Sequence, residues 1–370
     1  MKSFGSNELL EDVIHKNLCI GCGACVELCP YFRSYRGKTA MLFPCTLGEG
    51  RCWAYCPKVE VDLEALSEKF FGASYGTDAL GVYRAIHVAK AGPRLGDGSC
   101  QAGGTVSALM TCALEAGRID AAVLTDRDGL LPVPRIVTEP ADILRCASSK
   151  YAAAPTLVAL NRAVSRGYRR IGVVGTPCQV LATAQMRSNP LKDPDFADPL
   201  ALVVGLFCTW AIDFRALEPF IAQRVDIARV TKVDIPPPPA EIMEVYTAEE
   251  RIEIPLEEVR ELVPDSCSYC VDMTAEFSDV SVGVLEGCAD RNTLVVRTER
   301  GAALVEEAVK EGWLVVEEMP SENLEHLIWA AGNKKRRAFL KARQEGMVNT
   351  AGDARACIRV NPDTVDKIVA

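Results

Sequence analysis

The feature that most constrains this 370-residue chain is the spacing of the cysteines near its start. Between residues 19 and 30 they follow the pattern C-x2-C-x2-C-x3-C-P, and a second group ending in C-x3-C-P follows by residue 57. Thiolates are soft ligands, and in this pattern three cysteines bind one iron–sulphur cluster while the fourth binds its neighbour. The predicted ligands are Cys19, Cys22, Cys25, Cys29, Cys45, Cys52 and Cys56.

Disulfides and structural zinc are the two alternatives for closely spaced cysteines. We find no charged segment followed by an apolar core ahead of the run, so the sequence offers no export signal that would favour disulfides. Zinc sites usually pair two C-x2-C units or add histidines, whereas Pro30 and Pro57 belong to the cluster pattern. The pattern therefore favours iron–sulphur clusters.

The second group has one cysteine fewer than a bacterial dicluster ferredoxin would supply. A carboxylate such as Glu49, a more distant cysteine, water or a three-iron cluster would each account for the gap, and the sequence leaves these four open. We expect one 4Fe-4S cluster on Cys19, Cys22, Cys25 and Cys56, and a second cluster on Cys29, Cys45 and Cys52.

Composition excludes several functional classes. Hydrophobic residues make up 49% of the chain, charged residues make up 25%, and the net charge is -9, as in an acidic globular protein. The basic run 334–337 (KKRR) is predicted to be a solvated helix face, so no nucleic-acid partner is expected. No apolar run is long enough to form a membrane helix.

Sulphur ligands dominate the reactive side chains, with 16 cysteines against three histidines. His15, His87 and His326 are each predicted to be structural, which argues against a mechanism built on several histidine bases. A cysteine-rich chain without an export signal is expected in a reducing, oxygen-poor cytoplasm.

The order of predicted elements divides the chain into three parts. Residues 1–75 are expected to form a dicluster ferredoxin-like domain that ends in a helix over 62–71 and a glycine-rich linker. Residues 76–300 alternate strands with helices, which predicts an α/β domain with a mainly parallel sheet. Residues 301–370 are expected to form a C-terminal helical extension, in which two helices flank a strand over 313–317. The predicted strands of the α/β domain cover residues 84–90, 121–125, 135–138, 170–174, 201–207, 279–285 and 293–298, with a hairpin at 244–254.

A small-residue turn at Gly103, Gly104 and Thr105 opens a predicted helix. Free backbone N–H groups at a helix start suit a phosphate or another electron-rich group. The turn is not G-x-G-x-x-G, so it does not support a Rossmann nucleotide site, and a plain tight turn is the alternative.

Four further cysteines suggest a third cluster. Cys178 and Cys208 follow predicted core strands, and the carboxyl ends of parallel strands converge on the ligand crevice of an open sheet. Cys267 and Cys270 form a C-x2-C pair that could join them. A redox-active dithiol or half of a zinc site is the alternative for this pair, and a buried apolar cysteine is the alternative for each of the other two.

These motifs together resemble the beta subunit family of coenzyme F-420-reducing hydrogenase. That family includes the beta subunit of F-420-dependent formate dehydrogenase and the ferredoxin-dependent 7-hydroxymethyl chlorophyll a reductase. The matching segments occur in the family's order across residues 20–297. They are CQAGGTVSAL (100–109), LEAGRID (114–120), SSKY (148–151), GTPCQ (175–179), GLFC (205–208), CSYCVD (267–272) and FSDVSVG (277–283).

The resemblance implies a flavin-binding domain of that family's type, with FAD bound without a Rossmann fingerprint. Lys150 would supply a positive charge for the pyrophosphate or for the reduced ring. Cys100 departs from the family, in which a small residue without a thiol is commoner. The implied FAD-binding residues are Gln101, Gly103, Gly104, Thr105, Ser149, Lys150 and Tyr151.

The resemblance also implies a function as an electron-transfer subunit. A diffusible carrier, F-420 or NADH, would exchange a hydride with the flavin, and clusters would relay single electrons to a hydrogenase, a formate dehydrogenase or a heterodisulfide-reductase-like complex. No side-chain acid or base is needed for the hydride step. A stand-alone ferredoxin-dependent reductase of an organic substrate and a pure electron-relay protein are the two alternatives.

Overall fold

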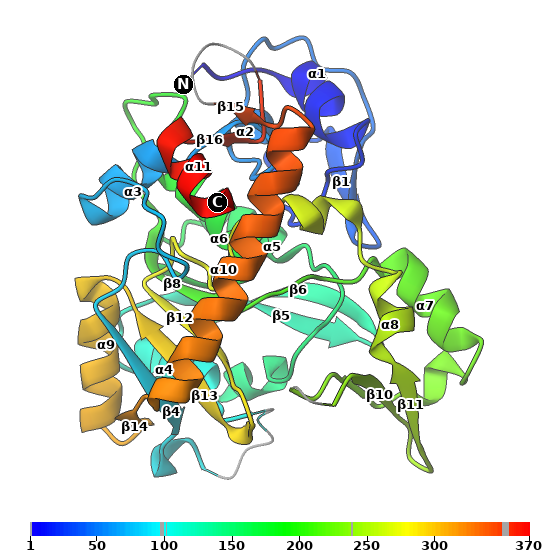
Figure 1. Ribbon diagram of the computed structural model, residues 1–370, viewed down its shortest axis with the longest axis vertical. Helices are drawn as coiled ribbons and strands as arrows, with labels where there is room; N and C mark the ends of the chain where they lie inside the picture. Colours follow the sequence, from blue (N-terminus) through cyan, green and yellow to red (C-terminus); the bar gives the residue numbers. More distant parts are fainter. Residues whose placement is uncertain (1, 97–99, 101, 238–239, 350–354) are drawn as a thin grey trace.

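A computed structural model describes residues 2–96, 100, 102–237, 240–349 and 355–370. An eight-stranded sheet with the order β14-β4-β13-β12-β8-β7-β5-β6 forms its centre (Figure 1). Every strand predicted for this sheet is present, with ends shifted by a few residues. The strands are β4 (Ala85–Ala91), β5 (Ala121–Asp128), β6 (Leu131–Val137), β7 (Ile171–Gly175), β8 (Leu200–Leu206), β12 (Val280–Leu285), β13 (Cys288–Val296) and β14 (Leu314–Glu318).

The sheet is mixed, so the prediction of a mainly parallel sheet is wrong for the sheet as a whole. Strands β5, β7, β8 and β12 are parallel to one another, while β6, β13, β4 and β14 are joined in antiparallel pairs. The turns β5–β6 and β12–β13 are too short for a parallel crossover, which needs a dozen or more residues. These two hairpins determine the direction of β6 and β13.

Helices cover both faces of the sheet. Successive strand residues point to opposite faces, so Val173 belongs to one hydrophobic core and Val174 to the other. Helices α5 (Thr156–Ser165) and α6 (Pro177–Arg187) contribute to the core that also includes the N-terminal region. Helices α4 (Thr105–Glu115) and α9 (Glu299–Lys310) contribute to the opposite core.

The cysteine-rich region packs against helix α5. The amide of Asn161 donates to the carbonyls of Ala24 and Val26 at 3.1 and 2.7 Å, and Leu157 N donates to Cys22 O at 3.0 Å. These bonds hold the first cysteine loop against the α/β core. The region contains α1 (Ser6–Leu9), a π-helical turn (Leu10–Ile14), β1 (Phe32–Tyr35), β2 (Lys38–Met41), α2 (Arg51–Ala54), β3 (Val61–Asp62) and α3 (Leu63–Phe71).

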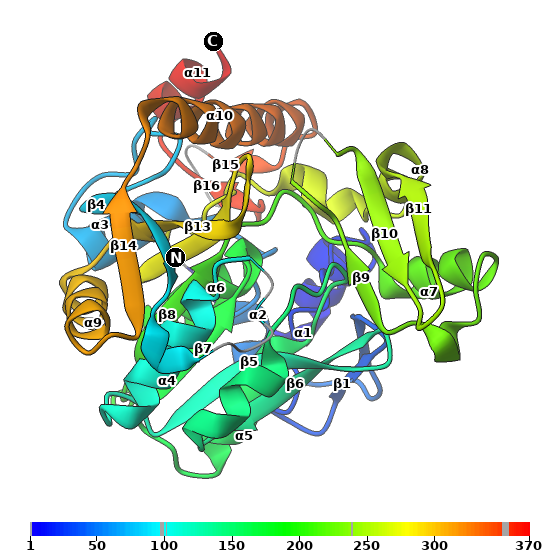
Figure 2. The same ribbon diagram turned by 90° about the horizontal axis from the view of Figure 1, so that it is seen from below.

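The C-terminal segment is built into two sheets. Strand β14 adds to the edge of the central sheet, and the long helix α10 (Ser321–Gln344) then crosses the molecule (Figure 2). Strands β15 (Val348–Asn349) and β16 (Ile358–Arg359) extend a small sheet that includes β3, and α11 (Pro362–Val369) ends the chain. The residues predicted as a helical extension therefore contribute strands beside both the α/β core and the cysteine-rich region.

A smaller lobe has its own core. The predicted hairpin is confirmed as β10 (Ile242–Tyr246) and β11 (Arg251–Pro255), with β9 (Lys232–Asp234) beside it. Helices α7 (Phe214–Ala222) and α8 (Leu256–Arg260) pack against these strands. Within the described residues, no helix is both long and apolar enough to cross a membrane.

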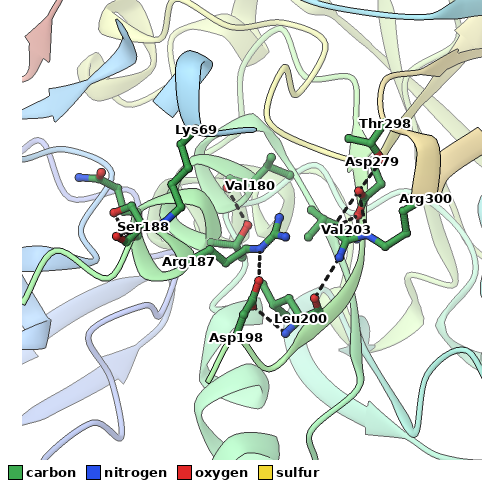
Figure 3. Close-up of polar contacts among 12 residues, drawn as sticks. Lys69, Val180, Arg187, Ser188, Asp198, Leu200, Val203, Asp279, Thr298 and Arg300 are labelled. Carbon is green, nitrogen blue, oxygen red and sulfur yellow. Dashed lines mark hydrogen bonds and ion pairs between the residues drawn. The ribbon is translucent and has the colours of Figure 1, made fainter. Parts of the chain in front are cut away.

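A buried carboxylate fixes strand β12 beside β8. Asp279 accepts hydrogen bonds from Val203 N at 2.8 Å, from Thr298 Oγ1 at 2.7 Å and from the guanidinium of Arg300 at 3.0 Å (Figure 3). One side chain thus joins β8, β12 and the start of α9. The network holds in place the two strands whose carboxyl ends form one side of the site described next.

Candidate functional site

A cavity of about 470 Å³ lies at the carboxyl ends of the parallel strands. The turn before α4, the segment 148–154, the ends of β7 and β8, and the C-x2-C segment all line it. These segments are far apart in the sequence. The cavity therefore brings together the predicted flavin turn, the predicted Ser-Lys-Tyr segment and the four cysteines of the predicted third cluster.

The glycine turn lies tightly against the sheet. A Cβ on Gly103 would come within 2.8 Å of Asn292 Oδ1 and 3.0 Å of Ala89 O, so no side chain fits there. Gly104 has a φ of +73°, a conformation that favours glycine. Thr105 is buried, and its hydroxyl has no hydrogen-bond partner among the described residues. A helix start suits a phosphate oxygen through its backbone N–H groups. Gln101 lies outside the described residues.

The Ser149, Lys150 and Tyr151 segment forms another part of the cavity wall. The ammonium of Lys150 donates to the carbonyls of Cys146, Ala147 and Ser148 at 2.6 to 2.9 Å. Burial lowers the pKa of Lys150 to about 8. The predicted positive charge is therefore present below that pH and held by three backbone oxygens.

The four cysteines of the predicted third cluster line the same cavity. Cys178 lies in the first turn of α6, and Cys208 follows β8. Burial and, after it, the neighbouring thiols of Cys270 and Cys267 raise the pKa of Cys178 to about 11. Burial also raises the pKa of Cys208, with a further contribution from the other three thiols. The four thiols thus lie close enough to act on one another.

The cysteines of the N-terminal region fall into the two sets that their spacing predicts. Cys19, Cys22, Cys25 and Cys56 line a second, small cavity. Burial and, to a smaller extent, the thiols of Cys29 and Cys45 raise the pKa of Cys52 to about 11, which places these three cysteines together.

Cys357, a distant cysteine, lies beside the first set. Its thiol donates to Lys58 O at 3.2 Å, and it raises the pKa of Cys56 after the larger effects of burial and of other neighbours. Cys357 therefore lies near Cys56.

The thiol sets suit clusters better than single ions. Among the described residues, no three Cys, His, Asp or Glu side chains converge closely enough to bind one metal ion. A 4Fe-4S cluster instead takes four thiolates around its periphery. None of the three histidines lines either cavity within the described residues.

The two cavities share a wall. Ile20, Cys22 and Lys58 line both of them, so the first cysteine set lies next to the larger cavity. Lys58 is buried, and its ammonium donates to Ser266 O at 2.8 Å, directly before the C-x2-C segment. The cysteine-rich region and the α/β region therefore meet at the thiols.

The basic run 334–337 corrects a prediction made from the sequence. Lys334 and Lys335 are buried, with exposed fractions of 6% and 1%, while the two arginines are exposed. Lys334 lines the larger cavity and donates to Cys208 O at 2.6 Å and Asp272 O at 2.8 Å. Lys335 pairs with Glu276 at 2.9 Å. The prediction of a solvated face is wrong for these two residues.

The signal that would have found them is the helical period of the apolar residues. Ala331, Ala338, Phe339 and Ala342 are buried and lie on the same side of α10 as the two lysines. Such spacing marks the buried face of a helix, whatever the charge of the residues between them. Nothing in the sequence indicated Asn292, whose Oδ1 accepts a hydrogen bond from Thr105 N at 3.3 Å and so holds the glycine turn. A single asparagine in a strand belongs to no periodic pattern.

Comparisons with known proteins agree with this geometry. Models for the N-terminal and C-terminal parts of the coenzyme F-420 hydrogenase/dehydrogenase beta subunit match residues 88–161 and 168–322. A model for a 4Fe-4S binding domain matches residues 12–31, which include the first four cysteines.

Two curated relatives and one solved structure illustrate the similarity. The coenzyme F-420-dependent sulfite reductase of Methanocaldococcus jannaschii is 29% identical over 79% of this chain, but the match spans only 46% of that protein. The coenzyme F-420 hydrogenase subunit beta of Methanothermobacter thermautotrophicus is 28% identical, over 66% of this chain and 87% of the subunit.

The solved structure is the F-420-reducing NiFe hydrogenase complex of Methanosarcina barkeri. One of its chains matches with a TM-score of 0.66 and 24% identity, over 72% of this chain and 93% of that chain, which shows a shared fold. The two beta-subunit models together span more than half of the sequence. The chain therefore belongs to the coenzyme F-420 hydrogenase/dehydrogenase beta subunit family, as an oxidoreductase of that type with an N-terminal 4Fe-4S ferredoxin motif.

Proposed function

We propose that the protein exchanges a hydride between coenzyme F-420 and a bound FAD, and exchanges single electrons with a partner redox enzyme. The observation that carries this proposal is the larger cavity, because the glycine turn, Lys150 and the four thiols all line it. The F-420 named in both curated relatives supports the choice of carrier.

The residues around the cavity fit an FAD. Gly104 and Thr105 line the cavity at the start of α4, and a helix start suits a phosphate through its backbone N–H groups. Lys150 adds a positive charge that suits the pyrophosphate. When bound, FAD would supply the junction between two-electron hydride chemistry and one-electron clusters. The residues that line the cavity would hold the group beside the thiols.

The thiols are placed for a relay toward the N-terminal region. Cys178, Cys208, Cys267 and Cys270 would bind one 4Fe-4S cluster within the larger cavity, and the first N-terminal set lies across the shared wall. The set of Cys29, Cys45 and Cys52 would bind the outermost cluster. Its fourth ligand stays one of the four possibilities derived from the sequence.

An exposed apolar patch marks the side of the ferredoxin-like region on which we propose that the partner docks. Leu42, Phe43 and Leu47 are 53% to 67% exposed and lie within six residues of one another, in the loop that also carries Cys45. Grouped exposed apolar side chains are typical of protein interaction sites. The proposed partner is the catalytic subunit of a hydrogenase, a formate dehydrogenase or a heterodisulfide-reductase-like complex, with ferredoxin as a further candidate.

The proposal is tested by anaerobic titration of the FAD-reconstituted protein with reduced F-420 and, in parallel, with NADH. Flavin and cluster absorbance report the result. Rapid bleaching by reduced F-420 supports the proposal, and bleaching by NADH alone changes the carrier. If neither bleaches a flavin-replete sample while reduced ferredoxin does, the carrier role is wrong and a ferredoxin-driven reductase takes its place.

The charge of Lys150 predicts how FAD affinity depends on pH. Because burial lowers its pKa to about 8, the ammonium is present at pH 7 and is lost as the pH rises through 8. We expect FAD affinity to fall about tenfold between roughly pH 7 and 9. Fluorescence titration of FAD into the apoprotein at each pH measures this affinity.

A lysine-to-methionine pair provides the control for this pH dependence. Lys150→Met should bind FAD weakly at pH 7 and show little further change with pH, whereas Lys69→Met, at an exposed lysine, should behave as the native protein does. Equal pH profiles for native protein and Lys150→Met would contradict the role of this charge.

A further inference from the structure

Lys334 brings a buried charge to the thiols from a distant part of the chain. It lies in the middle of helix α10, beyond residue 322, where the match to the C-terminal family model ends. Its exposed fraction is 6%, and its ammonium donates to Cys208 O at 2.6 Å and Asp272 O at 2.8 Å. The first carbonyl belongs to Cys208, a cysteine of the four-thiol site, and the second lies two residues after Cys270, another member of that site.

Backbone carbonyls leave the positive charge of Lys334 without a neutralising partner. The ion pairs among the described residues do not include Lys334. The next residue of the helix, Lys335, does form one, with Glu276. The carboxylate of Asp272 instead accepts hydrogen bonds from Thr274 N and Glu276 N at 2.9 Å. The charge of Lys334 is therefore available to the sulphur groups of the cavity.

The charged and titratable groups around Lys334 are the carboxylate of Asp272 and the thiols of Cys208, Cys267 and Cys270. An isolated buried lysine would tend to lose its proton. Lys334 instead donates to two backbone carbonyl oxygens, which stabilise its protonated form. The side chain therefore brings a hydrogen-bonded ammonium to the four-thiol site.

We propose that Lys334 is a positioning residue that raises the reduction potential of a 4Fe-4S cluster bound by Cys178, Cys208, Cys267 and Cys270. The inference rests on the proposed function, which places a cluster at these thiols. One-electron reduction adds one negative charge to the site, and a fixed cation in a low-dielectric interior stabilises the reduced form more than the oxidised form. The electron comes from the reduced FAD of the proposed function, and Lys334 keeps its proton throughout.

A purely structural role for Lys334 makes a different prediction. If the side chain only satisfied two carbonyls, a neutral donor of similar size would serve as well, and removing it would affect stability without changing the potential. A charge effect requires the potential to follow the charge at position 334 and not the hydrogen bonds. The two roles can therefore be separated by variants that change one property at a time.

The experiment is an anaerobic redox titration followed by electron paramagnetic resonance on the reconstituted holoprotein. Lys334→Gln removes the charge and keeps a donor, and Lys334→Arg keeps both. Arg337→Gln removes the same charge from an exposed position one turn along the helix. The N-terminal clusters serve as an internal reference in each sample.

We expect Lys334→Gln to lower the equilibrium constant for reducing this cluster at least tenfold, which is 59 mV for one electron. Lys334→Arg and Arg337→Gln should leave it near the native value. A Lys334→Gln protein that holds the cluster at the native potential overturns the inference. If Lys334→Gln does not fold, Lys334→Met takes its place as the uncharged variant, judged by the same potential.

The failure of the proposed function would look different. Iron analysis of the native protein and of Cys208→Ser shows whether the four thiols hold a cluster at all. Equal iron content in the two proteins would show that the four thiols bind no cluster. That result would contradict both the proposed function and this inference. A cluster lost in Cys208→Ser but unchanged in potential in Lys334→Gln would overturn only the inference.

Discussion

Replacement of Cys208 by serine is expected to disconnect the flavin from the N-terminal clusters. Cys208 is partly buried two residues after β8, where the three other thiols of its set act on it. Serine supplies a harder oxygen ligand that suits iron–sulphur clusters poorly. Substitution of a residue that only supports a metal ligand lowers metal affinity or activity about 10–100-fold. Loss of a ligand itself should therefore slow electron transfer about 100-fold or more.

The measurement separates two half-reactions. Stopped-flow mixing with reduced F-420 should still bleach the flavin of Cys208→Ser at close to the native rate, because no residue of the proposed FAD site is altered. Reduction of the N-terminal clusters should then fail to follow. Iron analysis should show a loss of about four iron atoms per chain.

A second thiol provides the matched control. Cys288 lies at the start of β13, lines neither cavity among the described residues, and contacts Asp290 Oδ1 at 3.5 Å. Cys288→Ser should retain native iron content and native transfer. If Cys208→Ser behaves as Cys288→Ser does, the assignment of the four thiols to a cluster is wrong.

Replacement of Lys335 by methionine is expected to destabilise the fold by about 3–5 kcal/mol, the usual effect of breaking a buried ion pair. Lys335 and Glu276 have side chains only 2% and 3% exposed. The ammonium also donates to Asp78 O at 2.7 Å and lies over the ring of Tyr75. Removal of the lysine would leave a buried carboxylate without its counter-charge. Chemical denaturation of the apoprotein measures the change.

The loss should grow with pH. Burial raises the pKa of Glu276 to about 7 in the native protein, and Lys335 opposes this shift. The pKa of Glu276 is higher in the native protein than in the unfolded chain. The free energy of unfolding therefore falls as the pH rises from the unfolded-state pKa to about 7, and this group causes no further loss above that pH. Without Lys335 the pKa of Glu276 rises further, so the variant continues to lose stability above pH 7.

The partner substitution tests the cause. In the double variant Lys335→Met with Glu276→Gln, neither position of the pair carries a charge, so stability should be partly restored and the pH dependence above 7 should disappear. Arg336→Met, on the exposed side of the same helix, should change stability by less than about 0.5 kcal/mol. A single variant with a loss independent of pH would contradict the proposed charge effect.

Local features of this protein were readable from its sequence. The N-terminal cysteine spacing predicted the two sets of thiols, because ligands within a few residues of one another are placed by a short loop. Glycine at position 72 ended the predicted helix, where α3 stops with a left-handed cap at φ +64°. Strand and helix alternation predicted the α/β core.

Features that depend on long-range packing were decided only by the tertiary structure. The hairpins at β5–β6 and β12–β13 made the sheet mixed, and pairing of β3 with β16 joined the two ends of the chain. Lys334 and Lys335 looked like surface residues because a charged run is usually solvated. Their burial follows from the face of α10 that packs on the core. The period of the apolar residues marks that face, but the partners of the two lysines elsewhere in the chain leave no local pattern in the sequence.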